Sequence, residues 1–401
     1  MISEPRGGVT AVFTGGGTGG HIYPGLAVAA MLRESCVAHG IPIRICWIGN
    51  SGGMDRTIVE RSVGASGVRT ADVFYGIPSG KLRRYISIRN FFDLFKIAAG
   101  CVCAFFLLVR LRPALLFSKG GFVSVPPCLC AGLLGIPVYT HECDFTPGLA
   151  TRINSRPAKR ILLSYEETKD YLGAKALAKA VVTGNPVRPV FDAADARSGR
   201  LFLRISEGTK PVLLVLGGSL GARQLNALVR ENADWLCERF VVVHQTGAGG
   251  APEAAALEVH SNDYKPYAFI HAEMPDVIAA ADIVLSRAGA NSIWECAVLG
   301  KPLVLVPLCG AGTRGDQEEN AAYFERAGAA VVLAREKADS AHLREALSLM
   351  LDEPVRKSYG AAARALAGSG RPSERISALL FSEIAGVPDG QDGRPAAKGA
   401  V

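Results

Sequence analysis

The chain has 401 residues, 49% of them hydrophobic and 20% charged, which is enough for two hydrophobic cores and too long for one compact domain. The formal net charge is +7, and the first residues lack the basic, apolar and small-residue succession of a secretory signal. We therefore expect a reducing cytosol, with most of the ten cysteines serving as small buried apolar residues. The pairs Cys101/Cys103 and Cys128/Cys130 have no histidine or second cysteine pair beside them, so no metal site is expected.

In the first half, short β-branched runs alternate with helical stretches, which is typical of a parallel sheet covered by helices. Buried strands are expected at residues 9–13, 43–48, 115–117, 138–140 and 160–163. The stretch VVTGNPVRPVF follows at residues 181–191, and its glycine and two prolines interrupt any regular element. We therefore expect an N-terminal domain at residues 1–186.

The same alternation begins again in the second half. Strands are expected at residues 212–216, 240–244, 268–270, 283–285, 303–306 and 330–333. The sequence therefore predicts an α/β protein with two doubly wound, Rossmann-like domains, the second at residues 187–386. The last helix of that range could also pack back on the N-terminal domain. The Gly-, Pro- and Ala-rich tail at residues 387–401 is expected to be disordered and to carry no chemistry.

Both halves open with a glycine-rich turn after their first strand, VFTGGGTGG at residues 12–20 and VLGGSLGA at residues 215–222. Such a turn lets backbone N–H groups approach an anion and directs a positive helix terminus at it. The first turn fits the G-x-G-x-x-G dinucleotide pattern, but the second strand is followed by GNSGG, which offers Asn50 in place of an acid for the ribose. A NAD-dependent oxidoreductase is therefore disfavoured, whereas a tight turn without a ligand stays open.

His21 directly follows the first glycine-rich turn, and Pro24 suits the first turn of a helix. A histidine at the mouth of an anion-binding loop could donate to a phosphate or accept a proton from a hydroxyl. It could also merely cap the helix, and the sequence does not separate these roles.

In the second half, the stretch LSRAGANSIWECAVLGKPLVLVP indicates strand, loop, helix, loop and strand. Ser292 and Glu295 have the spacing of a capping box, which is one role for Glu295. A carboxylate near a helix start at the carboxyl edge of a sheet is also placed to hold the ribose hydroxyls of a nucleotide. Downstream, Gln317 and Asn320 stand where a loop enters a helix, and their amides could contact sugar hydroxyls or serve as plain solvated caps.

The basic charge is concentrated between Tyr75 and Gly120, a stretch that contains eight basic residues and one acidic residue. Within this window an uncharged apolar segment of 13 residues, 97–109, is too short to span a bilayer, which takes about 20 residues. An apolar surface bordered by cations suits a protein that rests on an anionic membrane. A buried helix with solvated basic ends explains the same pattern, and both interpretations stay open.

Seven motifs in order along the chain together resemble the MurG family, the membrane-associated N-acetylglucosaminyltransferases of peptidoglycan synthesis. They are GGTGGHIYPGLAVA (16–29), SGKLRRY (79–85), SKGGFVSVP (118–126), GNPVR (184–188), GGSLGA (217–222), HQTG (244–247) and Q-x-x-N-A (317–321). The resemblance implies a GT-B fold, with the lipid acceptor on the N-terminal domain and the nucleotide sugar on the C-terminal domain. It implies transfer of GlcNAc from UDP-GlcNAc to the 4-hydroxyl of the MurNAc residue of lipid I, giving lipid II and UDP with inversion.

The resemblance also implies a set of site residues. Glu295 would hold the ribose, Ser219 a phosphate, Gln317 the sugar, and Ile270 the uracil through its backbone. The remaining implied substrate-binding residues are Thr18, Gly19, Gly20, Arg188, Ala290, Asn291, Ser292, Ile293 and Trp294. Two positions depart from the family pattern. Asp144 replaces an asparagine, so an ionised side chain could accept but not donate there, and Leu220 replaces a glutamine.

Inversion by single displacement needs a base for the acceptor proton and positive charge for the departing UDP, without a cofactor or metal. His21 is the candidate base, with Glu142 as the next candidate and Asp144 after it. The implied partners are UDP-GlcNAc, lipid I, an anionic membrane surface and other cell-wall synthesis and division proteins, with no nucleic acid. The expected location is the cytoplasmic face of the plasma (inner) membrane, as a peripheral protein.

Two other classes of function share these features. One is a different GT-B enzyme, such as a glycolipid glycosyltransferase or a UDP-GlcNAc 2-epimerase. The other is a non-catalytic nucleotide-sugar-binding protein. An epimerase needs no lipid acceptor, so the N-terminal glycine loops and the basic apolar segment argue against it.

Overall fold

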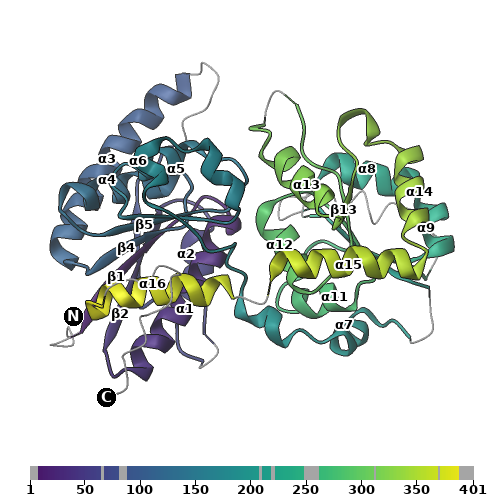
Figure 1. Ribbon diagram of the computed structural model, residues 1–401, viewed down its shortest axis with the longest axis horizontal. Coiled ribbons are helices and arrows are strands. Elements are labelled where there is room, and N and C mark those ends of the chain that lie inside the picture. The colour runs from purple at the N-terminus through teal and green to yellow at the C-terminus, as the bar shows by residue number, and fades with distance from the viewer. Residues whose placement is uncertain are drawn as a thin grey trace. The chain divides into compact units, whose positions relative to one another are not determined.

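The computed structural model describes residues 8–64, 67–80, 88–206, 210–217, 222–247, 262–310, 313–368 and 371–387. The chain forms two compact units, Met1–Arg188 with Arg371–Val401, and Pro189–Gly370. The division follows Arg188, two residues beyond the expected boundary. The final helix, α16 (Pro372–Ala385), belongs to the first unit and packs along α1 (Gly19–Ala38), as Figure 1 shows. The expected disordered tail lies outside the described residues, apart from its first residue.

The first unit contains a sheet of seven parallel strands in the order β3-β2-β1-β4-β5-β6-β7. The strands are β1 (Val9–Thr14), β2 (Ile43–Asn50), β3 (Val73–Ile77), β4 (Leu115–Ser118), β5 (Val138–Glu142), β6 (Arg160–Leu163) and β7 (Ala180–Val182). Besides α1 and α16, its helices are α2 (Asp55–Arg61), α3 (Ile88–Leu111), α4 (Val125–Leu133), α5 (Leu149–Asn154) and α6 (Ala174–Leu177), with short 3-10 turns at Phe122–Ser124 and Glu166–Tyr171.

The second unit contains a sheet of six parallel strands in the order β10-β9-β8-β11-β12-β13. The strands are β8 (Val212–Leu216), β9 (Val241–Gln245), β10 (Tyr264–Tyr267), β11 (Ile283–Ser286), β12 (Leu303–Leu305) and β13 (Ala330–Val332). The helices are α7 (Ala196–Leu203), α8 (Arg223–Glu231), α9 (Ala233–Arg239), α11 (Met274–Ala280), α12 (Ala290–Val298), α13 (Asp316–Arg326), α14 (Ser340–Leu349) and α15 (Glu353–Ala367), with 3-10 turns at Pro189–Ala193 and Arg335–Lys337.

The expected pair of doubly wound α/β domains is therefore confirmed, and so are ten of the eleven expected strands to within two residues at either end. The strand expected at residues 268–270 is wrong. The chain pairs with β9 earlier, at Tyr264–Tyr267, and Ile270 lies in the loop that follows. Two strands were not expected, β3 and β7, and both stand at the outer edges of the first sheet.

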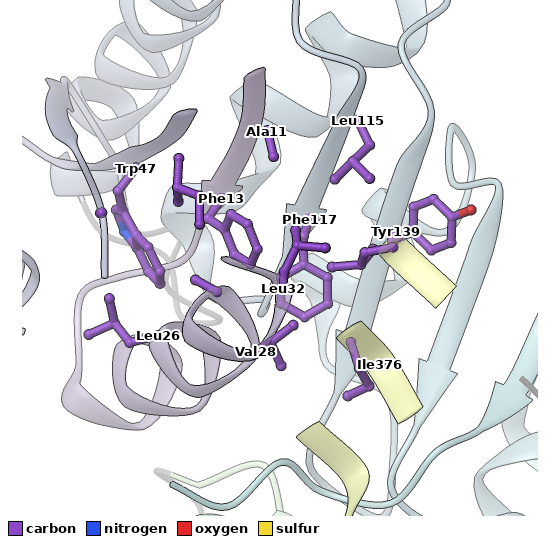
Figure 2. Close-up of a cluster of buried hydrophobic side chains, with 14 of the residues drawn as sticks. Ala11, Phe13, Leu26, Val28, Leu32, Trp47, Leu115, Phe117, Tyr139 and Ile376 are labelled. Carbon is purple, nitrogen blue, oxygen red and sulfur yellow. The ribbon is translucent and has the colours of Figure 1, made fainter. Parts of the chain in front are cut away.

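A buried cluster fixes the first glycine-rich turn to the sheet. Phe13 of β1 stacks with Trp47 of β2, with ring centroids 6.1 Å apart, and contacts Phe117 of β4 at 5.3 Å. Figure 2 shows these rings between the strands and α1, with Ile376 of α16 entering the same cluster. Each such fully buried apolar side chain stabilises the fold by roughly 2 kcal/mol, so α16 is held firmly to the first unit.

In each sheet the strand order reverses beside the first strand of the unit. The reversal lies between β1 and β4 in the first unit and between β8 and β11 in the second. Ligands of doubly wound sheets bind outside the carboxyl ends of the strands at this position. The loops after β1, β4, β8 and β11 are therefore the places to look for a site.

Candidate active site

The loop after β1 presents the N-terminus of a long helix at the reversal point of the first sheet. Gly15 and Gly17 have φ of +156° and +82°, which the turn from β1 into α1 requires. Thr18 is the N-cap of α1 and its side chain makes no capping hydrogen bond, and the first turn contains no acid. Gly19 and Gly20 are the first helical residues, so the positive end of a 20-residue helix is available to an anion.

His21 lies in the first turn of α1, against the loop that follows β4. It is not the cap, because Thr18 has that position and the His21 N–H donates to the Thr18 carbonyl at 3.1 Å. Gly120 and Gly121 have φ of +89° and +78°. A Cβ at Gly121 would stand 2.8 Å from His21 Cδ2, so the imidazole rests on this second loop, which permits no larger residue.

Three polar side chains hold the second loop in shape. The Gly120 N–H donates to Ser118 Oγ at 3.1 Å. Asn154 is completely buried, and its Nδ2 donates to Ser118 Oγ at 3.2 Å and to Ser124 Oγ at 2.8 Å. The surface under His21 is therefore built before any ligand arrives.

The structure places an acid at the end of β2, where the sequence had offered only Asn50. Asp55 is the first residue of α2 and is 1% exposed. Its carboxylate accepts the N–H of Gly17, at 3.0 and 3.2 Å to the two oxygens, and the N–H of Asn50 at 2.9 Å. Burial raises the pKa of this carboxyl, whereas the hydrogen bonds from the backbone oppose the rise. A carboxylate turned into the protein in this way cannot hold a ribose.

Lys119, which directly follows β4, and His141 of the neighbouring strand β5 form a buried basic pair. Lys119 is 1% exposed, and its Nζ has no hydrogen-bond partner among the described residues. His141 Nε2 lies 3.0 Å from the Gly184 carbonyl, so Nε2 carries the proton. Burial, followed by the charge of Lys119, lowers the pKa of His141 well below its usual value. His141 is therefore neutral beside the Lys119 side chain.

Glu142 holds the loop after β5. One carboxylate oxygen accepts the Asp144 N–H at 3.1 Å and the other accepts the Gly148 N–H at 2.8 Å. Glu142, Cys143 and Asp144 bring ligand atoms within 4.8 Å of one another, but the two oxygens of Glu142 already accept backbone donors. The geometry thus gives Glu142 a positioning role, and Asp144 stands half-buried beside it.

Arg188 is the last residue of the first unit before the chain enters the second. Its guanidinium lies over the ring of Tyr23, 5.3 Å from the centroid, and Tyr23 is 41% exposed on α1. The structure therefore brings Arg188 beside the same first turns of α1 that carry His21.

In the second unit, α12 presents its N-terminus at the reversal point. Gly289 is the N-cap, no side chain caps the helix, and the first turn contains no acid. The preceding loop is held by Arg287, whose Nη1 donates to the carbonyls of Val306 and Pro307, and by Asn320, whose Nδ2 donates to the Ala288 carbonyl at 3.2 Å. Asn320 is completely buried, so the expectation that its amide contacts a sugar is wrong.

Glu295 is half-buried in the second turn of α12. Because the helix starts at Ala290, Ser292 lies inside it and the capping-box interpretation of Ser292 and Glu295 is wrong. Ala290, Ile293 and Trp294 are buried, with Trp294 packed edge-on against Phe324 at 5.4 Å. Ala290 can therefore serve a ligand through the backbone of the helix start, whereas the N–H of Ile293 already donates to the Gly289 carbonyl at 3.2 Å and Trp294 lies beyond the first turn. Asn291, Ser292 and Glu295 are half-buried and have side chains within reach of solvent.

Ile270 is fixed by the end of β9. Its N–H donates to Gln245 Oε1 at 2.9 Å, and Gln245 is buried. The neighbouring His244 is also buried, with Nδ1 at 2.9 Å from Tyr264 Oη and Nε2 at 3.1 Å from Asn226 Oδ1. Burial lowers the pKa of His244 to about 4. Since the N–H of Ile270 is already donated, its carbonyl is the backbone group left for a base.

Gln317 lies in the first turn of α13, and its Oε1 accepts the N–H of Leu308 at 3.0 Å. This bond leaves the two amide hydrogens of Gln317 for a ligand. Ser219 and Leu220 lie outside the described residues.

Two known family domains match this chain, one in each half of the sequence. Residues 11–163 match the glycosyltransferase family 28 N-terminal domain, and residues 212–374 match the C-terminal domain of the same family. A UDP-N-acetylglucosamine–N-acetylmuramyl-(pentapeptide) pyrophosphoryl-undecaprenol N-acetylglucosamine transferase from Treponema denticola is 53% identical over 330 residues, which cover 80% of this chain and 83% of the relative. The chain belongs to the MurG family of glycosyltransferase family 28.

Solved structures agree on the fold. MurG from Acinetobacter baumannii superposes with a TM-score of 0.68 at 24% identity, covering 94% of this chain and 99% of that one. A UDP-GlcNAc 2-epimerase from Neisseria meningitidis bound to UDP-GlcNAc superposes with a TM-score of 0.63 at 15% identity, covering 94% and 99%. Both enzyme types thus share the GT-B fold of the MurG family, and the fold alone does not separate them.

Several residues that hold the loops of the candidate site were not singled out from the sequence. Asp55, Asn154, Gln245 and Arg287 act by holding loops, through hydrogen bonds to backbone groups that are remote in sequence. Asp55 did have one available sign, an acid five residues after the end of β2. The others stand among ordinary polar residues, and only the fold reveals their partners.

Proposed function

We propose that this chain transfers GlcNAc from UDP-GlcNAc to the 4-hydroxyl of the MurNAc residue of lipid I, giving lipid II and UDP with inversion at the anomeric carbon. The observation that carries the proposal is the 53% identity to an N-acetylglucosamine transferase of this specificity, over a length that includes both units. An epimerase and a non-catalytic binding protein have no use for the acceptor loops of the first unit.

In this reaction the acceptor hydroxyl oxygen forms a bond to C1 of GlcNAc while the bond from C1 to the UDP oxygen breaks, and the electron pair leaves with UDP. We assign His21 as the base that takes the hydroxyl proton. Its support is position, since it stands in the first turn of α1 between the two glycine loops. The helix start of Thr18, Gly19 and Gly20 would hold the acceptor's diphosphate, and Asp144 would contact the sugar as an acceptor of hydrogen bonds.

The departing UDP needs positive charge or N–H donors. In the second unit the uncapped start of α12 supplies them, and Glu295 holds the ribose, Ile270 the uracil and Gln317 the sugar. Arg188 and Ser219 complete the diphosphate contacts. Glu142 acts by fixing the loop that carries Asp144.

We further propose that α3 rests on an anionic membrane surface at the cytoplasmic face. One narrow stripe of this helix, Asp93, Gly100, Ala104 and Leu108, is buried against the unit. Eight large apolar side chains of the helix are exposed: Phe91, Phe92, Leu94, Phe95, Val102, Phe105, Phe106 and Val109. Lys96, Arg110 and Arg112 are exposed cations along the same helix and its end, whereas the side chains of Lys81, Arg83, Arg84 and Arg89 lie outside the described part.

The apolar part of α3 is longer than the 13-residue segment that the sequence indicated. Within the described residues, one helix, Phe91–Leu111, is 21 residues long and apolar enough to cross a membrane by length and composition. The shorter sequence estimate stopped at Lys96 and Arg110, which the longer segment includes. Peripheral contact is still favoured, because α3 packs along α4 and β3 of the sheet and a crossing would carry those polar-edged strands into lipid.

The reaction is tested with radiolabelled UDP-GlcNAc and a lipid I analogue. Labelled lipid supports the transferase, epimerised free sugar the epimerase, and retained label without product a binding protein. Within the transferase, His21→Ala should lower kcat by about 100-fold at saturating donor. His39→Ala, at the other end of α1, is the matched control and should keep kcat within about twofold. Near-normal turnover of His21→Ala would end the base assignment.

A further inference from the structure

An internal carboxylate occupies the first glycine-rich loop. Both oxygens of Asp55 accept the Gly17 N–H, and Oδ2 also accepts the Asn50 N–H, which ties the loop after β1 to the end of β2. The contact is so close that a Cβ at Gly16 would overlap Asp55 Oδ2. The position of Asp55 therefore leaves no room for a side chain at residue 16, and the loop shields Asp55 from solvent.

In dinucleotide-binding loops, glycines at these positions let the backbone approach a bound pyrophosphate, and the acid after the second strand holds the ribose. Here the acid, Asp55, points into the protein, and its carboxylate accepts the Gly17 N–H of the loop. The next group of N–H donors along the chain is the start of α1, which begins at Gly19 and has no side-chain cap and no acid in its first turn. A second anion beside Asp55 would meet like charge, whereas an anion at the start of α1 would not.

We propose that Asp55 is a positioning residue that determines which anion the first unit accepts. Its carboxylate stands in for a nucleotide phosphate inside the loop, closes the loop to nucleotides, and directs the acceptor's diphosphate to the first turn of α1. This inference rests on the proposed function, since it concerns the acceptor of that reaction.

The alternative is that Asp55 only stabilises the fold, as the first residue of α2. The two roles differ in what they do to the substrates. A purely structural residue changes the melting temperature and leaves both KM values alone, or changes both together. A positioning residue of the first unit changes the KM of the lipid acceptor and spares that of UDP-GlcNAc.

The test is Asp55→Asn, with Asp72→Asn as the matched control. Asp72 also accepts a backbone N–H of β2, that of Ile45 at 2.7 Å, but near the opposite end of the strand. Asp55→Asn should raise the acceptor KM by about tenfold, with the donor KM within about twofold. Asp72→Asn should leave both KM values within about twofold. An unchanged acceptor KM in Asp55→Asn, or equal rises in both KM values, overturns the proposal.

A second pair of variants reaches the same carboxylate from the other side. Gly16→Ala forces Asp55 out of the loop, while Gly52→Ala places a Cβ where nothing lies within 4 Å. Gly16→Ala should reproduce the acceptor-specific effect of Asp55→Asn, and Gly52→Ala should not. If the acceptor KM of Gly16→Ala equals that of Gly52→Ala, the proposal is wrong.

The wild-type protein gives a test that needs no variant to fold. Amide hydrogen exchange is measured with and without saturating inorganic pyrophosphate. The Gly17 amide should exchange slowly in both states because Asp55 already binds it, whereas the amide of Gly19, the first residue of α1, should slow only with pyrophosphate. Slowing at Gly17 alone would contradict the proposal. If wild type forms no labelled lipid, the proposed function fails while this measurement still decides the role of Asp55.

Discussion

The imidazole of His21 rests on the backbone of Gly121: a Cβ added at Gly121 would lie only 2.8 Å from His21 Cδ2. His21 and the second glycine loop are thus one structural unit, although 100 positions separate His21 from Gly121 in the sequence. Ser118 and Asn154 hold that loop in turn. The position of the His21 imidazole is therefore set by side chains from β4 and α5 as much as by α1.

This contact predicts a specific effect of Gly121→Ala. The added methyl displaces the imidazole, and a displacement of about 1 Å at a catalytic group lowers kcat by about 100-fold. The backbone strain at φ +78° also lowers the unfolding free energy by about 1 kcal/mol. Turnover at saturating substrates and chemical unfolding measure the two effects separately.

Gly135→Ala is the matched control. Gly135 has φ of +70° in the same unit, and nothing lies within 4 Å of a Cβ there. It should lose a similar amount of stability and keep its turnover. If Gly135→Ala loses kcat as severely as Gly121→Ala, strain rather than displacement of His21 explains the loss.

His244 predicts how the stability of the second unit depends on pH. Burial lowers its pKa from 6.5 to about 4, so in acid the unfolded chain takes up a proton that the folded chain refuses. The stability is present above pH 6.5 and is lost as the pH falls toward 4, by about 3 kcal/mol for this residue. Guanidinium unfolding followed by tryptophan fluorescence, to which Trp235 and Trp294 of this unit contribute, should show a shallower pH dependence in His244→Gln than in wild type.

Equal pH slopes in His244→Gln and wild type would contradict that prediction. His141 has the same kind of shift but lies in the first unit, so its contribution is common to both proteins. The comparison between the two proteins therefore isolates His244.

The sequence was sufficient for the fold because the central strands are continuous apolar runs, such as VLLVL in β8, and glycine-rich turns follow the first strand of each unit. It failed at three of the four sheet edges, β3, β7 and β10. β3 reads VFYGI, with a glycine inside it, and β10 reads YKPY, with a lysine and a proline that disfavour a central strand. Edge strands bury less surface, so their patterns are weaker.

The helix starts that offer backbone N–H groups could be predicted from the sequence. The side chains that hold the neighbouring loops in place could not. The starts of α1 and α12 were expected from Gly20 and Glu295 and their surroundings. Asp55 was missed because a carboxylate that binds its own backbone looks, in sequence, like any helix start. Asn320 was misjudged for the converse reason, since its amide is used inside the fold.

The hydrogen bond from Ile270 to Gln245 predicts how the donor base is held. Because the N–H of Ile270 is donated to Gln245 Oε1, the carbonyl of Ile270 is free to accept the N3–H of uracil. Gln245→Met removes the acceptor and should raise the KM of UDP-GlcNAc by about tenfold. The KM of the lipid acceptor is the internal control. UDP methylated at N3 should bind wild type more weakly than UDP in calorimetry, and equal binding would contradict the carbonyl contact.

Cys103 offers a direct test of membrane contact, because it is exposed on α3 among the apolar residues of the outer face. Vesicles containing anionic lipid should protect Cys103 from alkylation by iodoacetamide, whereas neutral vesicles should protect it less, since the exposed cations Lys96 and Arg110 contribute about 1 kcal/mol each near an anionic surface. Cys309, half-buried in the second unit, is the internal control and should react at the same rate with and without vesicles. Mass spectrometry of the alkylated peptides separates the two sites. Equal alkylation of Cys103 with and without anionic vesicles would remove α3 from the membrane contact.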